Sequence, residues 1–509
     1  MAVLGRNALT TVVALGVLSG MSACRGRGAA SAPVESRAAD RLSRAAETLR
    51  QPLEIEGQPP ETWPLGERMR LFSVPGVSVA VIENGRLATA RAWGVTVTGG
   101  GDPVTTETMF QAGSLSKPVT ALLALALVGD GVLDLDRPVN GFLRSWKVPD
   151  NEFTRATPVT LRHILTHQAG LTRFGYIVPR SEGAVPGMAE LLGGEKRNWP
   201  AVTVDFEPGT RHAYSNPGFC VLQLALEDVS GRTLHDLATV RLFAPLGMRH
   251  STFDEPLAPR VLEAAAAGHH RRRAEDGSGS EPVMVAGRAE MAPGAAGGLW
   301  STPSDLARAV EEVLRARSGE SRRILTAELA NAFVTAQTPG EGLGIHLEGA
   351  GPALRARHGG GMTGFVADLV FYPGAGLGAV VMSNSDGGGF LNEELLAGIA
   401  HAFRWPGYPV RRRLAKAAPE GLGELVGVYG LESFPESTFT VRLENDVPTG
   451  QVGRHPPFEL AATTEPDLFV LPRQSLEVVF GRSRDGRVET VTLRRAGQTG
   501  NRYRRVGSR

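Results

Sequence analysis

Lysine is nearly absent from this chain of 509 residues, which has four lysines against fifty arginines. Arginine is effectively always protonated, whereas a buried lysine can lose its proton and act as a base. A chain that uses arginine almost everywhere therefore has a physical reason to retain a particular lysine. Lys117 is the informative one, because it follows Ser114 by three residues at the start of an apolar stretch.

Cysteine is also scarce, and the sequence has only Cys24 and Cys220. Cys220 lies in an apolar helical pattern, which favours a buried structural thiol over a nucleophile. With one cysteine beyond the leading segment, we expect a fold that does not depend on disulfides. The net charge of +1 at pH 7 gives no electrostatic case for a nucleic-acid partner.

Apolar runs long enough to cross a bilayer are absent, since the run at 8–18 is too short for a hydrocarbon core of about 30 Å. A positive charge precedes this run and Met21-Ser22-Ala23-Cys24 follows it, which is the layout of a secretory signal. Residues 1–24 resemble a bacterial lipoprotein signal, in which Cys24 becomes the lipidated first residue. We expect an exported, periplasm-facing protein of the cell envelope, attached to the membrane by this lipid.

The run from Ser114 to Lys117 opens an apolar helix, with Pro118 in its first turn. A spacing of three residues places both side chains on one helical face, within reach of each other. The free amides of a helix start favour developing negative charge at the serine. Taken alone, the pattern is also typical of an ordinary helix start, with a serine cap and a solvated surface lysine.

Two further motifs follow in the chain. Tyr214 and Asn216 lie in a turn-rich loop before an apolar helix. A phenol near an ammonium is driven toward phenolate, so Tyr214 is a candidate proton acceptor, and the amide of Asn216 can hold a substrate carbonyl or the lysine. His358 precedes three glycines, which allow close backbone approach and can present an N–H to an oxyanion.

The ordered set S-x-x-K, Y-x-N and H-x-G resembles the serine β-lactamase and penicillin-binding protein superfamily, in its class C and DD-peptidase branch. Surrounding sequence agrees over roughly residues 70–405. The resemblance implies that Ser114 is the nucleophile and that Lys117 and Tyr214 form the base system. It also implies a pocket completed by substrate-binding and oxyanion residues, with the backbone amides of Ser114 and Gly361 as the oxyanion hole. The residues of this second group are Asn216, His358, Gly360 and Gly361.

The third motif departs from that of lactamases and DD-peptidases, in which a Thr or Ser stands at the middle position. Gly359 occupies this position, so the hydroxyl that helps to hold a substrate carboxylate is absent. The His-Gly-Gly form is similar to D-aminopeptidases and some esterases of the family. The resemblance therefore implies a serine hydrolase of small-molecule or short-peptide esters or D-amino-acid amides, with no cofactor and no metal. A DD-carboxypeptidase, a lactamase or a slowly turning-over sensor remains the alternative, and the oligomeric state stays open.

Four segments follow from the composition. They are the signal at 1–24, a tether and leading helix at 25–60, a hydrolase domain at 61–408 and a β-rich module at 418–507. Segregated strands and helices in the third segment predict an α+β fold, with an antiparallel sheet flanked by helices. The last segment has short alternating runs and an Asp485-Gly486 turn, which resemble a small lipocalin-like antiparallel β-barrel.

Two histidines have a spacing that could indicate a metal. His163 and His167 are four residues apart, but no glutamate follows His163 and no third ligand can be identified in the sequence. The matching segment of the family carries histidine for structural reasons. We therefore predict a structural role for this pair and no zinc site.

Overall fold

The computed structural model of the protein describes residues 34–173, 178–179, 187–194, 199–254, 257–273, 280–284, 290–291, 293–416, 419–432, 434–471, 475–496 and 500–506. The expected signal at 1–24, with Cys24, lies outside the described residues. In the described ranges no helix is both long and apolar enough to cross a membrane.

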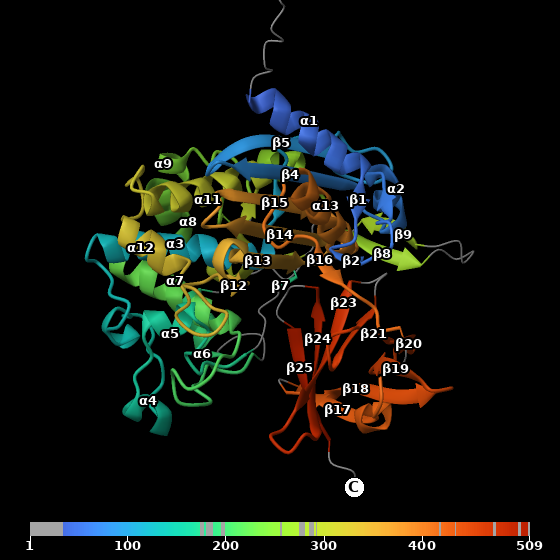
Figure 1. Cartoon of the computed structure of the whole chain (residues 1–509). Coiled ribbons are helices and arrows are strands. Elements are labelled where there is room, and N and C mark those ends of the chain that lie inside the picture. Colours follow the sequence, from blue (N-terminus) through green and yellow to red (C-terminus); the bar gives the residue numbers. More distant parts are fainter. Residues whose placement is uncertain are drawn as a thin grey trace, which may run out of the picture.

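A six-stranded antiparallel sheet lies at the centre of the larger part of the chain (Figure 1) and has the order β12-β13-β14-β15-β4-β5. Its strands are β4 (Gly76–Glu83), β5 (Arg86–Gly94), β12 (His346–Glu348), β13 (Arg355–Met362), β14 (Phe365–Tyr372) and β15 (Leu377–Ser383). Asn84 and Gly85 join β4 to β5 with φ values of 54° and 70°, as the Asn-Gly pattern predicts. The predicted antiparallel sheet is therefore confirmed.

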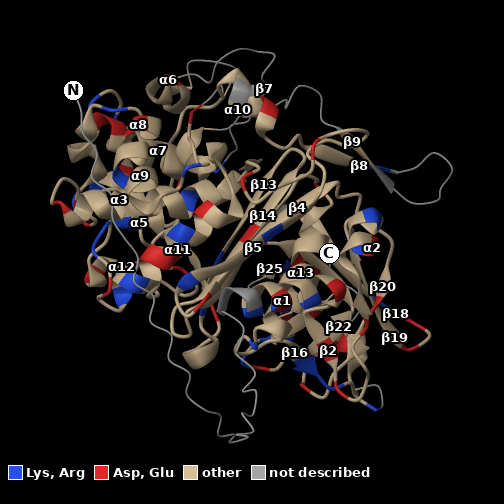
Figure 2. Cartoon of the chain, turned by 90° about the horizontal axis from the view of Figure 1, so that it is seen from above, with Lys and Arg blue, Asp and Glu red and all other residues tan. Residues whose placement is uncertain are grey.

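Helices cover both faces of this sheet. One face carries α1 (Val34–Glu47), α2 (Leu65–Leu71) and α13 (Gly388–Ala402), and the other carries α3 (Ser116–Gly129), α7 (Asn216–Ser230) and α11 (Pro303–Arg317). Seen from above, the strands form a diagonal band between these two groups (Figure 2). Along β4, Val79 and Val81 pack in one apolar cluster and Ala80 and Ile82 in the other, so this strand is buried on both sides.

Shorter elements complete this part of the chain. The helices are α4 (Glu152–Ala156), α5 (Leu161–Leu165), α6 (Met188–Gly193), α8 (Leu234–Ala238), α9 (Ala244–Leu246), α10 (Pro259–Ala264) and α12 (Ala327–Phe333). The strands are β1 (Leu49–Arg50), β2 (Leu53–Ile55), β3 (Thr62–Trp63), β6 (Phe110–Gln111), β7 (Val178–Pro179), β8 (His269–Arg273), β9 (Ser280–Met284), β10 (Glu290–Met291), β11 (Trp300–Ser301) and β16 (Val410–Arg412). Leu42 and Leu49 are fully buried against α13, so the leading segment is part of the packed structure from α1 onward.

The C-terminal part is a separate antiparallel sheet with the order β20-β19-β18-β17-β25-β24-β23-β22-β21. Its strands are β17 (Gly427–Leu431), β18 (Phe434–Glu444), β19 (Val447–Val452), β20 (Phe458–Glu459), β21 (Ala461–Ala462), β22 (Leu468–Leu471), β23 (Leu476–Arg482), β24 (Val488–Arg495) and β25 (Gly500–Arg505). Its two edge strands, β20 and β21, are separated by a single residue, so the sheet is a nearly closed barrel. Tyr429, Phe439 and Phe480 fill its interior, and the predicted Asp485-Gly486 turn joins β23 to β24.

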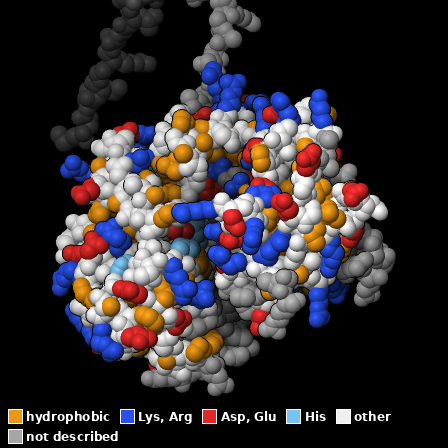
Figure 3. Space-filling model, turned by 60° about the horizontal axis from the view of Figure 1, so that its bottom comes forward, with side chains coloured by type: hydrophobic (Ala, Val, Ile, Leu, Met, Phe, Trp, Pro, Cys, Tyr) orange, Lys and Arg blue, Asp and Glu red, His pale blue; other side chains and the backbone are white. Residues whose placement is uncertain are grey.

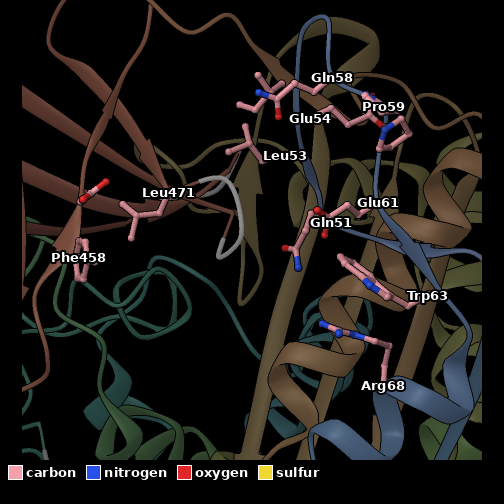
Figure 4. A pocket seen from close by; sticks show the side chains of 13 residues that line it. Gln51, Leu53, Glu54, Gln58, Pro59, Glu61, Trp63, Arg68, Phe458 and Leu471 are labelled. Atoms are coloured by element: carbon pink, nitrogen blue, oxygen red, sulfur yellow. The ribbon is translucent and has the colours of Figure 1, made fainter. Parts of the chain in front are cut away.

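The barrel meets the larger part through the leading segment, β16 and the first turns of α13, where Arg495 contacts Phe390 and Glu393. β16 pairs in parallel with β2, and a small apolar cluster there joins Leu53 to Val470 and Ala496. A cavity of about 780 Å³ opens beside this junction, between Trp63 and Arg68 on one side and barrel residues on the other (Figure 4). This large cavity is lined by none of the residues of the three sequence motifs.

Candidate active site

Ser114 lies in the turn η1 (Gly113–Leu115), which leads directly into the buried helix α3. Gly113 has a φ of 53°, and a Cβ at this residue would lie 2.7 Å from the backbone nitrogen of Gly361. Glycine is therefore required where this turn passes strand β13. Pro118 is the third residue of α3, as predicted, because the first turn of a helix needs no intrahelical N–H donor.

Lys117 is fully buried, and its Nζ is surrounded by neutral oxygens. It donates to Ser114 Oγ at 3.0 Å, to Asn216 Oδ1 at 2.7 Å and to the backbone oxygen of Ala296 at 2.7 Å. Burial lowers the pKa of Lys117 to about 7, and no salt bridge from the described residues opposes this effect. The lysine is therefore partly neutral at pH 7, which removes the surface-lysine alternative.

Tyr214 donates its hydroxyl to Ser114 Oγ at 2.9 Å. The expectation that a nearby ammonium drives this phenol toward phenolate is wrong, because burial raises the pKa of Tyr214 to about 12. The hydrogen bond to Ser114 lowers this pKa, but it does not outweigh burial. Tyr214 is therefore a protonated donor in the resting structure, and Lys117 is the better candidate for the resting base.

Helix α7 positions Asn216 and the buried thiol beside Lys117. Ser215 caps the helix by accepting from the amide of Gly218 at 3.1 Å, which fixes Asn216 as its first residue. Cys220 follows one turn later and is fully buried, and burial raises the pKa of its thiol to about 12. The thiol therefore stays protonated and acts in packing, as its apolar pattern predicts.

The third motif lies on β13, next to the turn that carries Ser114. A Cβ on Gly360 would lie 2.0 Å from the backbone oxygen of Ala112, so only glycine permits this close approach. The approach places the amide of Gly361 beside η1, where the oxyanion hole is predicted. His358 is 4% exposed, and burial holds the pKa of its imidazole well below its usual range. The third motif therefore presents a neutral ring at neutral pH.

A cluster of side chains that the sequence motifs did not indicate lies next to the imidazole ring of His358. His346 stacks on His358 with ring centroids 4.9 Å apart, and its Nδ1 lies 2.8 Å from Glu341 Oε1. His212 Nε2 lies 3.2 Å from the same carboxylate oxygen. Burial alone would raise the pKa of Glu341, but hydrogen bonds with the two histidines lower it. Histidines gather at the middle of this face of the molecule, among arginine and lysine side chains (Figure 3).

The other candidate residues have structural partners. Ser116 Oγ donates to the backbone oxygen of Gly113 at 2.7 Å, and His163 caps α5 together with Thr160. His167 Nδ1 accepts from the amide of Ser215 at 3.2 Å, and its ring lies 4.3 Å from that of Tyr214. These contacts position the loop that carries Tyr214. Within the described ranges no three His, Cys, Asp or Glu side chains are grouped as metal ligands.

Residues 66–402 match the family model described as beta-lactamase. Penicillin-binding protein 4 of Amycolatopsis lactamdurans is 28% identical over 61% of this chain and 81% of its own length. A D-aminopeptidase of Cereibacter sphaeroides is 25% identical over 74% of this chain and 67% of its own length. Esterase EstB of Burkholderia gladioli is 29% identical over 55% of this chain and 76% of its own length.

Solved structures agree with this fold. The crystal structure of SurE has a TM-score of 0.58 and 26% identity, and the match covers 87% of this chain and 97% of SurE. An octameric penicillin-binding protein homologue from Pyrococcus abyssi has a TM-score of 0.54 and 22% identity over 86% of this chain and 98% of its own, which supports the fold alone. Both matches extend beyond the segment 66–402, which is two thirds of the chain. The predicted β-lactamase and penicillin-binding fold is confirmed.

Proposed function

This chain belongs to the beta-lactamase family, and from that premise we propose an exported serine hydrolase that acts on esters or D-amino-acid amides through an acyl-enzyme on Ser114. The observation that carries the proposal is the buried Lys117, whose Nζ lies 3.0 Å from Ser114 Oγ and whose pKa is lowered to about 7. A serine hydroxyl is a weak nucleophile until an adjacent base takes its proton.

The geometry supports one order of proton transfers. Neutral Lys117 accepts the proton of Ser114 as Oγ attacks the substrate carbonyl, and the resulting oxyanion accepts from the amides of Ser114 and Gly361. The carbonyl–leaving-group bond then breaks, and the leaving group takes a proton through Tyr214, which is re-protonated by Lys117. In the second half Lys117, neutral again, takes a proton from the attacking water, the acyl–Oγ bond breaks, and this proton passes to Ser114 Oγ as the acid product leaves.

The substrate class follows from what surrounds the third motif. Gly359 provides no hydroxyl, and the neutral ring of His358 provides no positive charge, at positions where the family binds the carboxylate of penicillins. A hydrogen bond to a charged group is worth about 1.5–3 kcal/mol, so the handicap is about 10- to 150-fold. The relatives named D-aminopeptidase and esterase agree with this preference.

Two measurements test the proposal. A fluorophosphonate probe should label the wild type and spare Ser114→Ala, while the control Ser116→Ala keeps its label; labelling of Ser114→Ala would sink the assignment. Short-chain p-nitrophenyl esters or D-amino-acid anilides should be cleaved, with weak or no turnover of nitrocefin. A burst on an activated ester without steady-state release would indicate a sensor instead of an enzyme.

Substitution of the glycine gives a sharper test of substrate class. A Cβ at Gly359 would meet Asp368 Oδ1 at 3.8 Å and the backbone oxygen of Ala367 at 4.0 Å, both ordinary van der Waals distances, so the backbone has room for threonine. Gly359→Thr should raise the ratio of nitrocefin to ester turnover by about tenfold or more, since it restores one hydrogen bond to a charged group. A wild type that cleaves nitrocefin as fast as its best ester contradicts the proposed class.

We propose the cellular location of the protein from residues 1–24 alone. Residues 1–24 have the layout of a lipoprotein signal, which supports an envelope protein held at the membrane by lipid on Cys24. Full-length protein expressed in a bacterium should partition into the detergent phase of Triton X-114. Cys24→Ala should abolish this partition, and a wild type that stays in the aqueous phase contradicts lipidation.

A further inference from the structure

Packing requires glycine at only one of the three glycine positions of β13. Gly360 must be glycine, because a Cβ there would collide with the oxygen of Ala112 at 2.0 Å. A Cβ on Gly361 would meet nothing within 4 Å, and a Cβ on Gly359 would meet only Asp368 Oδ1 at 3.8 Å and the backbone oxygen of Ala367 at 4.0 Å. Neither of these two residues has a positive φ. What their missing side chains leave is open space on the other face of β13 from the one on which Gly360 meets the Ser114 turn.

That space is a cavity of about 340 Å³ on the face of β13 that carries Gly359 and Gly361. Its walls come from β13, β14, α13, the turn after α13, and the end of β24 in the barrel. The charged and aromatic residues of the wall are Arg355, Arg357, Asp368, Glu393, Trp405, Tyr408 and Arg495. One end of the cavity is therefore at the predicted oxyanion hole, and the barrel forms part of the wall.

Two of the three arginines in the wall are engaged. Arg355 pairs with Glu348 at 3.1 Å, and Arg495 pairs with Glu393. Asp368 accepts from the amide of Asn392 at 3.0 Å. With Glu348, the wall carries three arginines and three carboxylates, so its formal charge is balanced, and the third arginine is the cation with the longest ion pairs.

Arg357 is that cation. Its Nη1 lies 3.5 Å from Glu348 Oε1 and its Nη2 lies 3.9 Å from Asp368 Oδ1, both longer than an ordinary hydrogen bond. A carboxylate matches the planar guanidinium in two parallel bonds.

We propose that this cavity is a subsite for a carboxylate at the far end of a substrate's leaving group, with Arg357 as the residue that binds it. The proposal rests on the hydrolase function proposed above. Arg357 is four residues from Gly361, about 13 Å of strand at about 3.3 Å per residue. The carboxylate of a penicillin, on the carbon next to its lactam nitrogen, cannot extend this far from the scissile bond. The subsite is therefore compatible with weak turnover of nitrocefin.

Matched esters test the subsite in the full-length protein. The pair is 3-(4-acetoxyphenyl)propanoic acid and its primary carboxamide, which share the acyl group and the reach of the leaving group and differ in charge. For the wild type we expect kcat/KM for the acid to exceed that for the carboxamide by about 10- to 100-fold, the scale of hydrogen bonds to charged groups. O-acetyltyramine, which ends in an ammonium, should be the poorest substrate.

Variants test whether Arg357 causes the preference for the acid over the carboxamide. Arg357→Gln should bring the ratio of acid to carboxamide close to one while carboxamide turnover is kept, and Arg357→Lys should restore part of the preference. Leu396→Trp, which fills the cavity from α13, should slow both long esters and spare p-nitrophenyl acetate. Arg413→Gln is the matched control, since this arginine is 69% exposed at the barrel junction and does not line the cavity.

The outcomes separate this proposal from the hydrolase function. A wild-type ratio near one, a preference for O-acetyltyramine, or an unchanged ratio in Arg357→Gln overturns the subsite while ester turnover stands. No turnover of any ester and no fluorophosphonate label overturns the hydrolase function itself.

Discussion

Lys117 in the hydrolase part and Glu477 in the barrel are both fully buried and both carry an ionisable group. Their surroundings are opposite. Glu477 accepts from Arg412 Nε at 2.8 Å and from Arg494 Nε at 2.8 Å, so two cations compensate its charge. Among the described residues, the hydrogen-bond partners of Lys117 Nζ are three neutral oxygens, and no carboxylate pairs with it.

The difference separates a structural charge from a catalytic base. Moving a charge out of water costs several kcal/mol, and paired charges recover much of this cost, as in the barrel. Without a counter-charge the same cost shifts the protonation equilibrium, which is why the pKa of Lys117 falls to about 7. Arginine, with its very high pKa, serves the first role and cannot serve the second.

The largest effect should come from Lys117→Arg. This change keeps the charge and removes the ability to deprotonate near neutrality, so kcat/KM for a p-nitrophenyl ester should fall by about 10²-fold or more. In the wild type, activity should rise with pH through about 7, because the neutral lysine is the active form. Near-normal rates in the variant would show that the lysine acts only through its charge. Circular dichroism melts control for folding.

The next effect concerns the paired acid in the barrel. Glu477→Gln leaves Arg412 and Arg494 without their carboxylate, and breaking a buried ion pair costs about 3–5 kcal/mol. Urea unfolding should show a loss of this order for the barrel, with unchanged kcat/KM for p-nitrophenyl acetate. A variant as stable as the wild type would contradict the structural role of the pair.

The smallest effect, taken per pH unit, is a pH dependence of stability. The pKa of Lys117 is about 7 in the folded chain against 10.5 for a free lysine, so the unfolded state binds more protons between these values. Stability should therefore rise with pH from about 7 to 10, by at most about 1.4 kcal/mol per pH unit. Lys117→Met should lack this contribution. Melting temperatures of the wild type and of Lys117→Met across this pH range measure the contribution of Lys117. If the two proteins show the same dependence on pH, the contribution is contradicted.

Local sequence was sufficient for much of the fold and for the placement of the motifs. The Asn84-Gly85 and Asp485-Gly486 turns and the helix start at Ser114 depend on residues close in the chain, so their patterns are readable. The leading helix expected within residues 25–60 is α1, Val34–Glu47. The family resemblance also anticipated that Ser114, Lys117 and Tyr214 would meet, although about 100 residues separate the first from the last.

Tertiary packing decided what depends on burial and on distant partners. The protonated state of Tyr214, the neutral ring of His358 and the contact of Lys117 with Ala296 have no local signal in the sequence. The same holds for the Glu341 cluster and for the cavity between β13 and the barrel. A motif specifies which groups are present, but a pKa and a cavity depend on how far water and charges are excluded by segments far away in the chain.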